Sequence, residues 1–393
     1  MANRAETLDE NIFTIADLKR EGSAKMIKAH RGRSEEKYYN EGAMEMESLL
    51  DNEQAYRRYK IRPRILVDVD RLDMSTDIFG VKSSNTGPFP LGFSPSAMHK
   101  LAHPEGEVAT SKAAASQGIC MGLSSYSTTS LEDVAAQGEG NPYFVQICVL
   151  KDRRTTLQLL KRAERYKAVF VSVDVPVLGR RLNEMRNNFV LPEEMEFPNI
   201  LSNGKAEFSG DNEATAYGER HSKPSRNCML TAVDASLKWD TAIPWLKANT
   251  KMQIWLKGVN TAEDVALAIQ HELDGIVISN HGGRQLDGIP ATLDTLRECA
   301  PIARGRISIA VDGGIRQGSD IFKALALGAQ HCFVGRVPIW GLAYKGQEGV
   351  ELGIKILMQE LAITMRLAGC ARIEDITSAH LAVLTRDGIL AKL

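Results

Sequence analysis

The sequence predicts an α/β fold in which eight parallel strands, each followed by a helix, close into a (β/α)8 TIM barrel. Short apolar runs alternate with segments of helical pattern, and eight such units fit within about 250 residues, the usual span of this barrel. A chain of 393 residues, 44% of them hydrophobic, is also long and apolar enough for one large core. The alternative is an open, doubly wound sheet, which shows the same alternation of strand and helix.

The strands are expected where apolar residues run without interruption, as is typical of strands buried on both faces. In chain order these runs lie at residues 89–93, 118–123, 143–149, 168–174, 253–257, 273–278, 307–312 and 331–335. Helical patterns at 105–116 and 153–165, and a helix beginning near Thr261, separate some of them. A barrel brings the carboxyl ends of all its strands to one mouth, so residues at those ends are the candidates for chemistry.

Two segments lie outside the repeat. Residues 1–85 are expected to form helices and an irregular cap within the same domain as the barrel, which spans 86–393. Residues 189–237 are polar and interrupt the unit of the fourth strand. A loop of this length inside a compact domain is typical of a lid over a site, although a surface loop without a role has the same composition.

Composition limits the classes of partner. A net charge of −1 argues against binding of nucleic acid or of an anionic membrane. The 6 cysteines include no closely spaced pair, which argues against a zinc site or a disulfide framework and favours an intracellular compartment; no metal site is predicted. No apolar run approaches the roughly 18 residues that span a bilayer, and residues 1–10 carry no apolar signal segment.

The segment after the sixth strand points most directly to chemistry. Residues 279–284 read Ser-Asn-His-Gly-Gly-Arg. His281 can accept a proton near neutral pH, and Arg284 can hold a carboxylate with two parallel hydrogen bonds. The glycine pair lets the backbone turn and approach a ligand. Together they indicate chemistry on a carbon next to a carboxylate, whereas a lone pair of this kind would also fit a buried structural histidine and a surface arginine.

The loops after the last two strands combine glycine with arginine. Gly313, Gly314 and Arg316 follow the seventh strand, and Gly335 and Arg336 follow the eighth. Barrels often bind phosphate with these loops, through glycine N–H groups at the start of a helix. A sugar phosphate or a nucleotide would fit, and turn glycines beside exposed arginines are the structural alternative.

Further motifs follow one another along the chain. They are Arg-Pro-Arg-Ile-Leu at 62–66, Ser-Pro-Ser-Ala-Met at 94–98, Ala-His-Pro-Glu-Gly at 102–106, Leu-Ser-Ser at 123–125, Val-Asp-Val-Pro at 173–176, Leu-Gly-Arg-Arg at 178–181, Leu-Lys-Gly at 256–258, Asp-Gly-Gly at 312–314 and Phe-Lys-Ala-Leu-Ala-Leu-Gly-Ala at 322–329. With the His281 segment, they make the chain resemble the FMN-dependent α-hydroxy-acid oxidase and dehydrogenase family, which includes glycolate oxidase and lactate oxidase. The resemblance runs from about residue 38 to residue 381.

The resemblance implies FMN at the mouth of the barrel. The residues implied at the flavin ring are Pro95, Ser96, Ala97, Ser124, Gln146, Ser172, Lys257 and Ser279. Asp312 is implied at the ribityl hydroxyls, and the residues implied at the phosphate are Gly313, Gly314, Arg316, Gly335 and Arg336. Lys257 is expected near flavin N1 and O2, where a cation favours the uptake of electrons.

The implied reaction is oxidation of an (S)-2-hydroxy acid to a 2-oxo acid. Its implied catalytic residues are His281, Asp174 and Lys257, and its implied substrate-binding residues are Tyr38, Arg181, Arg284, Tyr126 and Cys148. His281 accepts a proton, and Asp174 supports the imidazolium that forms. The sequence leaves open whether that proton comes from the α-carbon or from the hydroxyl group, with hydride transfer.

Two positions in the implied substrate pocket affect specificity. Cys148 stands where the family commonly has a tyrosine that contacts the substrate hydroxyl, and a thiol is smaller and a weaker donor. Tyr126 stands where glycolate oxidase has tryptophan and lactate oxidase has tyrosine. We therefore expect Cys148 to make room for a larger substrate; the structural alternative is a thiol that only packs against its neighbours.

Molecular oxygen is the expected electron acceptor, with hydrogen peroxide as product. The alternatives are a dehydrogenase with another acceptor and a non-catalytic FMN-binding protein; the intact set of Lys257, His281, Arg181 and Arg284 argues against the latter. The expected partners are a small 2-hydroxy acid, oxygen and further copies of the chain, as a homotetramer or homo-octamer. Ala391-Lys392-Leu393 resembles a peroxisomal address, so a peroxisomal location is expected, otherwise a cytoplasmic one.

Overall fold

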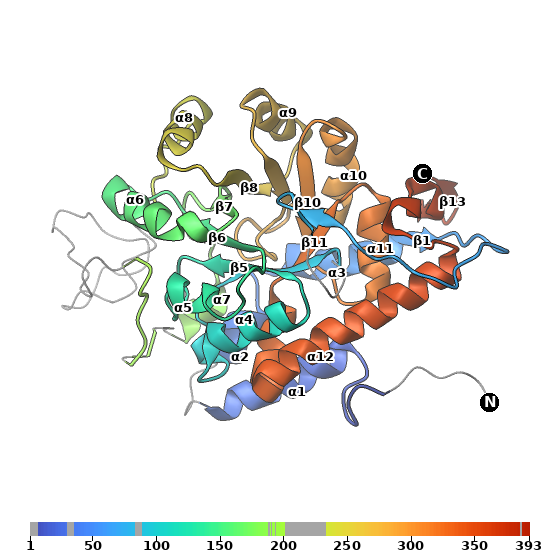
Figure 1. Ribbon diagram of the computed structural model, residues 1–393, viewed down its shortest axis with the longest axis horizontal. Coiled ribbons are helices and arrows are strands. Elements are labelled where there is room, and N and C mark those ends of the chain that lie inside the picture. The colour runs from blue at the N-terminus through green and yellow to red at the C-terminus, as the bar shows by residue number, and fades with distance from the viewer. Residues whose placement is uncertain are drawn as a thin grey trace.

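Eight parallel strands form a closed barrel in the order β10-β11-β4-β5-β6-β7-β8-β9 (Figure 1). The computed structural model describes residues 7–29, 35–82, 89–187, 189, 191–192, 194–200, 233–385 and 387–393. The barrel strands are β4 (Leu91–Ser96), β5 (Cys120–Ser124), β6 (Tyr143–Ile147), β7 (Ala168–Ser172), β8 (Gln253–Val259), β9 (Gly275–Ile278), β10 (Ser308–Asp312) and β11 (His331–Val334). They coincide with the eight predicted runs. Because β4 pairs with β11 and closes the ring, the TIM barrel is confirmed and the open sheet is wrong.

Helices follow the strands and surround the barrel (Figure 1). They are α4 (Gly106–Ser116), α5 (Leu131–Ala135), α6 (Arg153–Arg162), α8 (Trp239–Asn249), α9 (Ala262–Gln270), α10 (Thr292–Ala303), α11 (Gly318–Ala326) and α12 (Arg336–Ala368). The predicted helices coincide with α4, with α6 and its 3-10 extension η2 (Ala163–Arg165), and with α9. Asp152 and Thr261 cap α6 and α9, since their side chains accept backbone N–H groups of the first turn.

The interior of the barrel is filled by aromatic side chains. The rings of Phe144 and Phe170 stack at 3.8 Å, and Phe170 stacks on Trp255 at 5.3 Å. A Cβ at Gly275 would lie 2.3 Å from the Trp255 ring, so glycine makes the space that the indole fills. Phe79 meets these rings edge-on, from the loop between β2 (Asp77–Ile78) and β3 (Val81–Lys82). The barrel is therefore a packed core, and the room for a ligand lies at its mouth.

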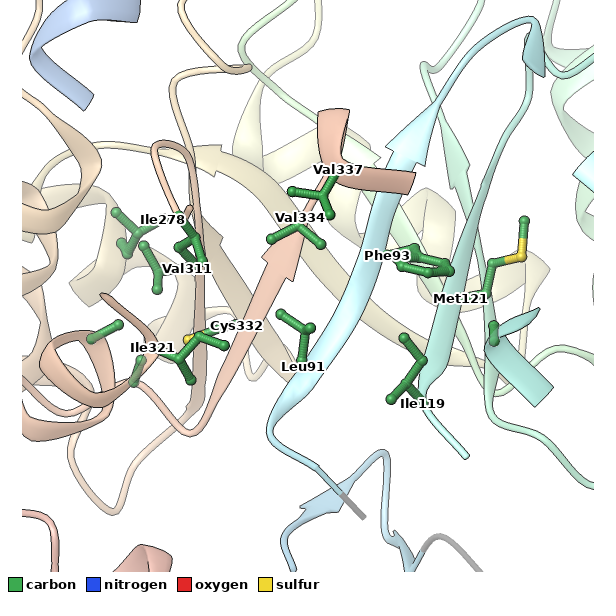
Figure 2. Close-up of a cluster of buried hydrophobic side chains, with 14 of the residues drawn as sticks. Leu91, Phe93, Ile119, Met121, Ile278, Val311, Ile321, Cys332, Val334 and Val337 are labelled. Atoms are coloured by element: carbon green, nitrogen blue, oxygen red, sulfur yellow. The ribbon is translucent and has the colours of Figure 1, made fainter. Parts of the chain in front are cut away.

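A second apolar layer lies between the strands and the helices. Figure 2 shows a part of it, in which Cys332 of β11 lies beside Ile321 of α11 and Val334 of β11 lies beside Val337 of α12, with Leu91 and Phe93 on the neighbouring strand β4. These side chains are all nearly inaccessible to solvent. Each strand thus presents alternate residues to the interior and to the helices, which explains the uninterrupted apolar runs in the sequence.

The N-terminal segment packs against the barrel and its last helix. It contains α1 (Ile15–Ala29), α2 (Glu35–Asn40) and α3 (Glu47–Arg58), and α1 runs along α12 (Figure 1). The strand β1 (Tyr59–Ile61) pairs with β12 (Leu381–Leu384), which pairs with β13 (Leu390–Lys392). The described residues also form the short 3-10 turns η1 (His99–Leu101), η4 (Ile373–Asp375) and η5 (Ser378–His380). In the described part of the chain, no helix combines the length and apolar character that crossing a membrane requires.

The predicted insert follows β7 and the short helix α7 (Leu182–Arg186). Most of it, residues 201–232, lies outside the described residues, as do residues 188, 190 and 193, so its role as a lid stays a prediction. Its first part is anchored near the mouth, because Asn199 donates to Ser127 Oγ at 2.7 Å and accepts from the Leu131 backbone at 2.9 Å.

Candidate active site

Alternation along the strands places a polar layer directly above the aromatic core. In β7 and β8, Phe170 and Trp255 face inward, and the next inward positions are Ser172 and Lys257. The same step leads from Phe144 to Gln146 in β6. The residues of this layer that were predicted as site residues are all buried and are Ser124, Gln146, Ser172, Lys257, Ser279 and Asp312. The barrel therefore brings together side chains that are far apart in the sequence.

His281 and Asp174 form the pair predicted as base and support. His281 Nδ1 lies 3.1 and 3.2 Å from the two oxygens of Asp174. Burial lowers the pKa of His281 below its usual value, against the opposing influence of Asp174. Burial opposes ionisation of Asp174 as well, but His281 and Lys257 outweigh it and lower the pKa of the carboxyl group. The arrangement is an uncharged imidazole that can accept a proton beside an ionised carboxylate.

Lys257 is held by two neighbours in the same layer. Its Nζ lies 3.1 Å from Asp312 Oδ2 and donates to Ser279 Oγ at 2.9 Å. Ser94 donates to the same Asp312 oxygen at 2.7 Å. The lysine is thus a fixed, buried cation, since its side chain is only 5% exposed.

Three polar side chains form a row across neighbouring strand ends. Gln146 donates to Ser172 Oγ at 3.0 Å and accepts from Ser124 Oγ at 3.3 Å. Nearby, Ser96 Oγ donates to the Gly335 carbonyl at 3.2 Å, and the Ala97 carbonyl accepts from Tyr39. Ser96 directly follows Pro95, so its contact with Gly335 shows that the predicted flavin-binding segment at the end of β4 borders the predicted phosphate loop after β11.

The two predicted clamp arginines converge. Arg284 Nη2 lies 2.9 Å and Arg181 Nη1 lies 3.4 Å from one oxygen of Glu184, and Arg181 Nε donates to the Arg284 carbonyl at 3.1 Å. Arg284 also donates to the Tyr38 carbonyl and lies over the Tyr38 ring, 4.6 Å from its centroid. The Tyr38 ring stacks on Phe189 of the insert at 4.7 Å.

Cys148 and Tyr126 line a small cavity of about 10 Å³ on the side of the mouth near α6. The remaining walls are mostly apolar and include Ile147, Leu159 and Ile200. Burial raises the pKa of the Cys148 thiol to about 12, so the thiol is uncharged. The Tyr126 hydroxyl is buried and has no hydrogen-bond partner among the described residues.

The predicted phosphate residues lie together at the ends of β10 and β11. Gly313 and Gly314 have φ of 99° and 77°, which favours glycine, and a Cβ at Gly314 would lie 2.0 Å from the Asn52 carbonyl oxygen. Gly335 directly precedes α12, so the N-terminus of that helix lies at this end of the mouth.

Two arginines frame this end of the mouth. Arg316 pairs with Glu53 at 2.9 Å and lies over Trp340 of α12, 4.8 Å from the ring centroid. Arg336 donates to backbone carbonyls of the cap and of Gly282, and burial lowers its pKa to about 9.

Comparison with known proteins identifies the family. Residues 28–383 match the model of the FMN-dependent dehydrogenase family. The chain belongs to this family. Oxidase FUB9 of Fusarium oxysporum f. sp. lycopersici is 47% identical to the chain over 383 residues, which cover 96% of this chain and 93% of the relative. Glycolate oxidase of Spinacia oleracea is 43% identical over 349 residues, which cover 88% and 90%.

Solved structures agree with this family of FMN-dependent dehydrogenases. A tyrosine-to-phenylalanine variant of mandelate oxidase, solved with (S)-mandelic acid, matches with a TM-score of 0.79 at 32% identity, over 94% of this chain and 98% of that one. A tyrosine-to-cysteine variant with benzoyl-formic acid matches with a TM-score of 0.78. The predicted family, the predicted barrel and FMN as the cofactor are confirmed.

The residues at the mouth have the chemistry that FMN requires. Asp312 Oδ1 is buried and has no hydrogen-bond partner within the described residues, so it can accept from a ribityl hydroxyl group. The loop at Gly314 leaves no room for a side chain, and cationic side chains stand beside it. The roles of the individual residues stay predictions, supported by this donor and acceptor set.

Several residues that lie at the mouth were not predicted from the sequence. Glu184 bridges the two arginines, and Gln285 joins their loops because it donates to the carbonyls of Asp174 and Val177, both at 2.9 Å. Lys19 of α1 reaches the end of the mouth that is predicted to bind the phosphate, where its Nζ lies 5.4 Å from the centre of the Trp340 ring. The spacing of Arg181 and Glu184 on a short helix was the available signal for the first of these.

Proposed function

We propose that this chain oxidises an (S)-2-hydroxy acid to the corresponding 2-oxo acid, with FMN as the bound electron acceptor. The observation that carries the proposal is the convergence of Arg181 and Arg284 at the same mouth as the His281–Asp174 pair and Lys257. Its family and its relatives, among them glycolate oxidase and mandelate oxidase, support an FMN-dependent 2-hydroxy-acid oxidase.

Each of these site residues then has a defined role. Arg181 and Arg284 bind the substrate carboxylate, which fixes the α-carbon relative to His281. His281 accepts the proton that leaves the substrate, and Asp174 stabilises the imidazolium that results. Bound FMN supplies the two-electron oxidation. Lys257 places a fixed positive charge where electrons arrive.

The substrate side chain is proposed to lie against Tyr126 and Cys148. The cavity beyond Cys148, of about 10 Å³, has room for no more than about one water, but the mostly apolar groups around it favour a substrate with an apolar side chain over glycolate. Tyr126 packs edge-on against Phe197 of the insert, with ring centroids 5.8 Å apart, so the described part of the insert forms one wall of this pocket.

Oxygen is proposed as the acceptor that returns FMN to its oxidised state, with hydrogen peroxide as product. The names of the relatives as oxidases support this choice over a dehydrogenase with another acceptor. The test is the amount of hydrogen peroxide formed per substrate oxidised in air, and a ratio near one is expected. Substrate turnover that requires an added dye as electron acceptor would contradict the proposal.

Anaerobic mixing with 2-hydroxy acids tests the central proposal. An (S)-2-hydroxy acid should bleach the flavin absorbance of the purified enzyme without oxygen, and the (R)-enantiomer should not. Arg284→Lys keeps the charge but loses the two-pronged geometry. Losing one partner of a buried charge pair is worth roughly 2–5 kcal/mol, so kcat/KM should fall on the order of 30- to several-thousand-fold. Normal FMN content with unchanged kcat/KM would remove Arg284 from the clamp.

The location and the assembly are proposed from the sequence. Ala391-Lys392-Leu393 is proposed as a peroxisomal address, and the structure has Ala391 and Lys392 paired with β12. A fluorescent fusion that keeps these residues should be punctate, and an unchanged pattern after their deletion would contradict the proposal.

A homotetramer or homo-octamer is proposed as the assembly of the enzyme. Light scattering of the purified enzyme measures its mass and so tests this proposal.

A further inference from the structure

The carboxylate clamp already holds a carboxylate of the chain itself. One oxygen of Glu184 lies 2.9 Å from Arg284 Nη2 and 3.4 Å from Arg181 Nη1. Within the described part of the chain, no other carboxylate is paired with either guanidinium. Glu184 therefore makes the contact that a bound substrate carboxylate would be expected to make.

The three side chains are shielded from water. Arg181 is 11% exposed, Arg284 is 14% exposed and Glu184 is 20% exposed. Burial and the neighbouring Arg284 lower the pKa of Arg181, whereas Glu184 opposes this effect. Two cations this close repel each other when no anion lies between them, so Glu184 stabilises the clamp in the absence of substrate.

The clamp keeps donors for a second anion. The hydrogen bonds within the described residues use three of the five N–H groups of Arg284, on Tyr38, Glu41 and Glu184. They likewise use three of those of Arg181, on Arg284, Glu184 and Gln285. A substrate carboxylate can thus enter the clamp, but it meets the negative charge of Glu184 there.

Glu184 is held in place by its own short helix. The Phe189 backbone donates to the Glu184 carbonyl at 3.0 Å, and the Phe189 ring stacks on Tyr38, whose own ring lies under Arg284. The helix α7 also begins directly after Arg181. The carboxylate is thus positioned by the same elements that position the clamp.

We propose that Glu184 is an internal carboxylate that competes with carboxylate ligands for the Arg181–Arg284 clamp and so sets their affinity. The inference rests on the proposed function, because it takes this clamp as the site of the substrate carboxylate. It makes Glu184 a determinant of affinity for the substrate, whose charge weakens binding although its oxygen helps to align the guanidinium groups.

Glu184→Gln separates these two effects, because glutamine keeps the acceptor oxygen and removes the charge. The probe is oxalate, a carboxylate that has no α-hydrogen to lose, titrated into the FMN-loaded enzyme and followed by the change in flavin absorbance. The dissociation constant of oxalate should fall about tenfold, which corresponds to about 1.4 kcal/mol. The KM of the best 2-hydroxy acid should fall with it, while the limiting rate of anaerobic flavin reduction should not rise.

Two controls make the result interpretable. Glu194→Gln removes the same charge from an exposed position of the insert and should leave oxalate binding unchanged. Glu184→Asp keeps the charge and should bind oxalate more weakly than Glu184→Gln does. Weaker or unchanged oxalate binding in Glu184→Gln would overturn the inference. If instead oxalate binds as well to Arg284→Lys as to the original enzyme, Arg284 does not belong to the clamp, and the carboxylate site on which the proposed function relies is wrong.

Discussion

At the scale of single residues, the backbone conformation of His281 positions the proposed base. Its φ of 57° lies in the left-handed region that side-chain-bearing residues rarely adopt. Gly282 and Gly283 continue the turn with φ of 64° and 73°, and the His281 N–H is held by Ser279 Oγ at 3.1 Å. The local strain is tolerated because the ring then meets Asp174, the partner that its chemistry needs.

With His281 as the proposed base, its lowered pKa is expected to set the pH dependence of the enzyme. Because the uncharged form is the base, kcat/KM should stay level through neutral pH and fall only below 6.5, the usual pKa of histidine. Asp174 raises the pKa of His281, so Asp174→Asn should move this acidic limb to still lower pH. It should also slow anaerobic flavin reduction by roughly 10²–10⁴-fold, the range for general-base catalysis, since the imidazolium loses its support. A limb that moves to higher pH would contradict this pairing.

Cys148 is expected to control the size of the substrate and not to act as a nucleophile. Its thiol is buried and uncharged, with a pKa raised to about 12. The ring added in Cys148→Tyr is much larger than the cavity of about 10 Å³ beyond this residue, so it should extend into the mouth, favour glycolate or lactate and penalise bulky 2-hydroxy acids. A regained hydrogen bond is worth roughly 0.5–1.5 kcal/mol, so the preference should shift a few- to about tenfold.

The matched variant for this position is Cys148→Ser, which keeps the shape and should keep most activity on the best substrate. Specificity profiles of both variants across short and long 2-hydroxy acids measure the effect. An identical profile in Cys148→Tyr, or near-complete loss of activity in Cys148→Ser, argues against size control.

The sequence was sufficient to predict the positions of residues that depend on the alternation of side chains along a strand. Lys257 lies two positions after Trp255 and Ser172 two positions after Phe170, so each inward polar residue follows an inward aromatic one. Glu184 and Lys19 could not be found in this way. Glu184 lies on a short helix outside the repeat, and Lys19 reaches the mouth only because α1 packs on α12.

At the scale of elements, the loop after β10 depends on contact with the cap. A Cβ at Gly314 would lie 2.0 Å from the carbonyl oxygen of Asn52 in α3, and Asn52 is itself fixed by two hydrogen bonds with Asn280 at 2.8 and 2.9 Å. Neither backbone can retreat easily. The loop therefore approaches α3 closely only because residue 314 is glycine.

Gly314→Ala should lower both stability and FMN affinity. Gly305→Ala is the matched control, because Gly305 also has a positive φ, of 69°, but a Cβ added there would meet no atom within 4 Å. A left-handed alanine should cost about 1–2 kcal/mol in each variant. Only Gly314→Ala should also weaken FMN binding, measured by quenching of flavin fluorescence. Equal FMN affinity in both variants would separate this loop from the cofactor site.

At the scale of the whole molecule, the cap and the barrel together build the end of the mouth where the FMN phosphate is proposed to bind. Arg336 of α12 donates to the Tyr39 carbonyl of α2, and the indole of Trp340 donates to Asn40 at 2.8 Å. The repeat of strand and helix predicted the barrel, since each unit folds against its neighbours. It could not predict these contacts, because they join residues about 300 positions apart.

The variant Gly22→Ala tests whether the packing of α1 against α12 affects the binding of FMN. A Cβ at Gly22 would lie 2.3 Å from the backbone oxygen of Trp340, so Gly22→Ala must push α1 away from α12. Overpacking of this kind costs roughly 1–3 kcal/mol, more than the helix-propensity gain of about 0.5–1 kcal/mol. Arg316 lies over the Trp340 ring, and Arg336 lies one helical turn before Trp340. Gly22→Ala should therefore lower both the melting temperature and the FMN affinity.

Gly353→Ala serves as the control in the same interface. Its Cβ would meet only the side-chain carbons of Val337 and Leu18, at 3.1 and 3.2 Å, and these can shift slightly. Both variants gain the same helix propensity, so their difference isolates the clash with the Trp340 backbone. If Gly22→Ala melts earlier yet binds FMN like Gly353→Ala, the cap stabilises the barrel without shaping the phosphate end of the mouth.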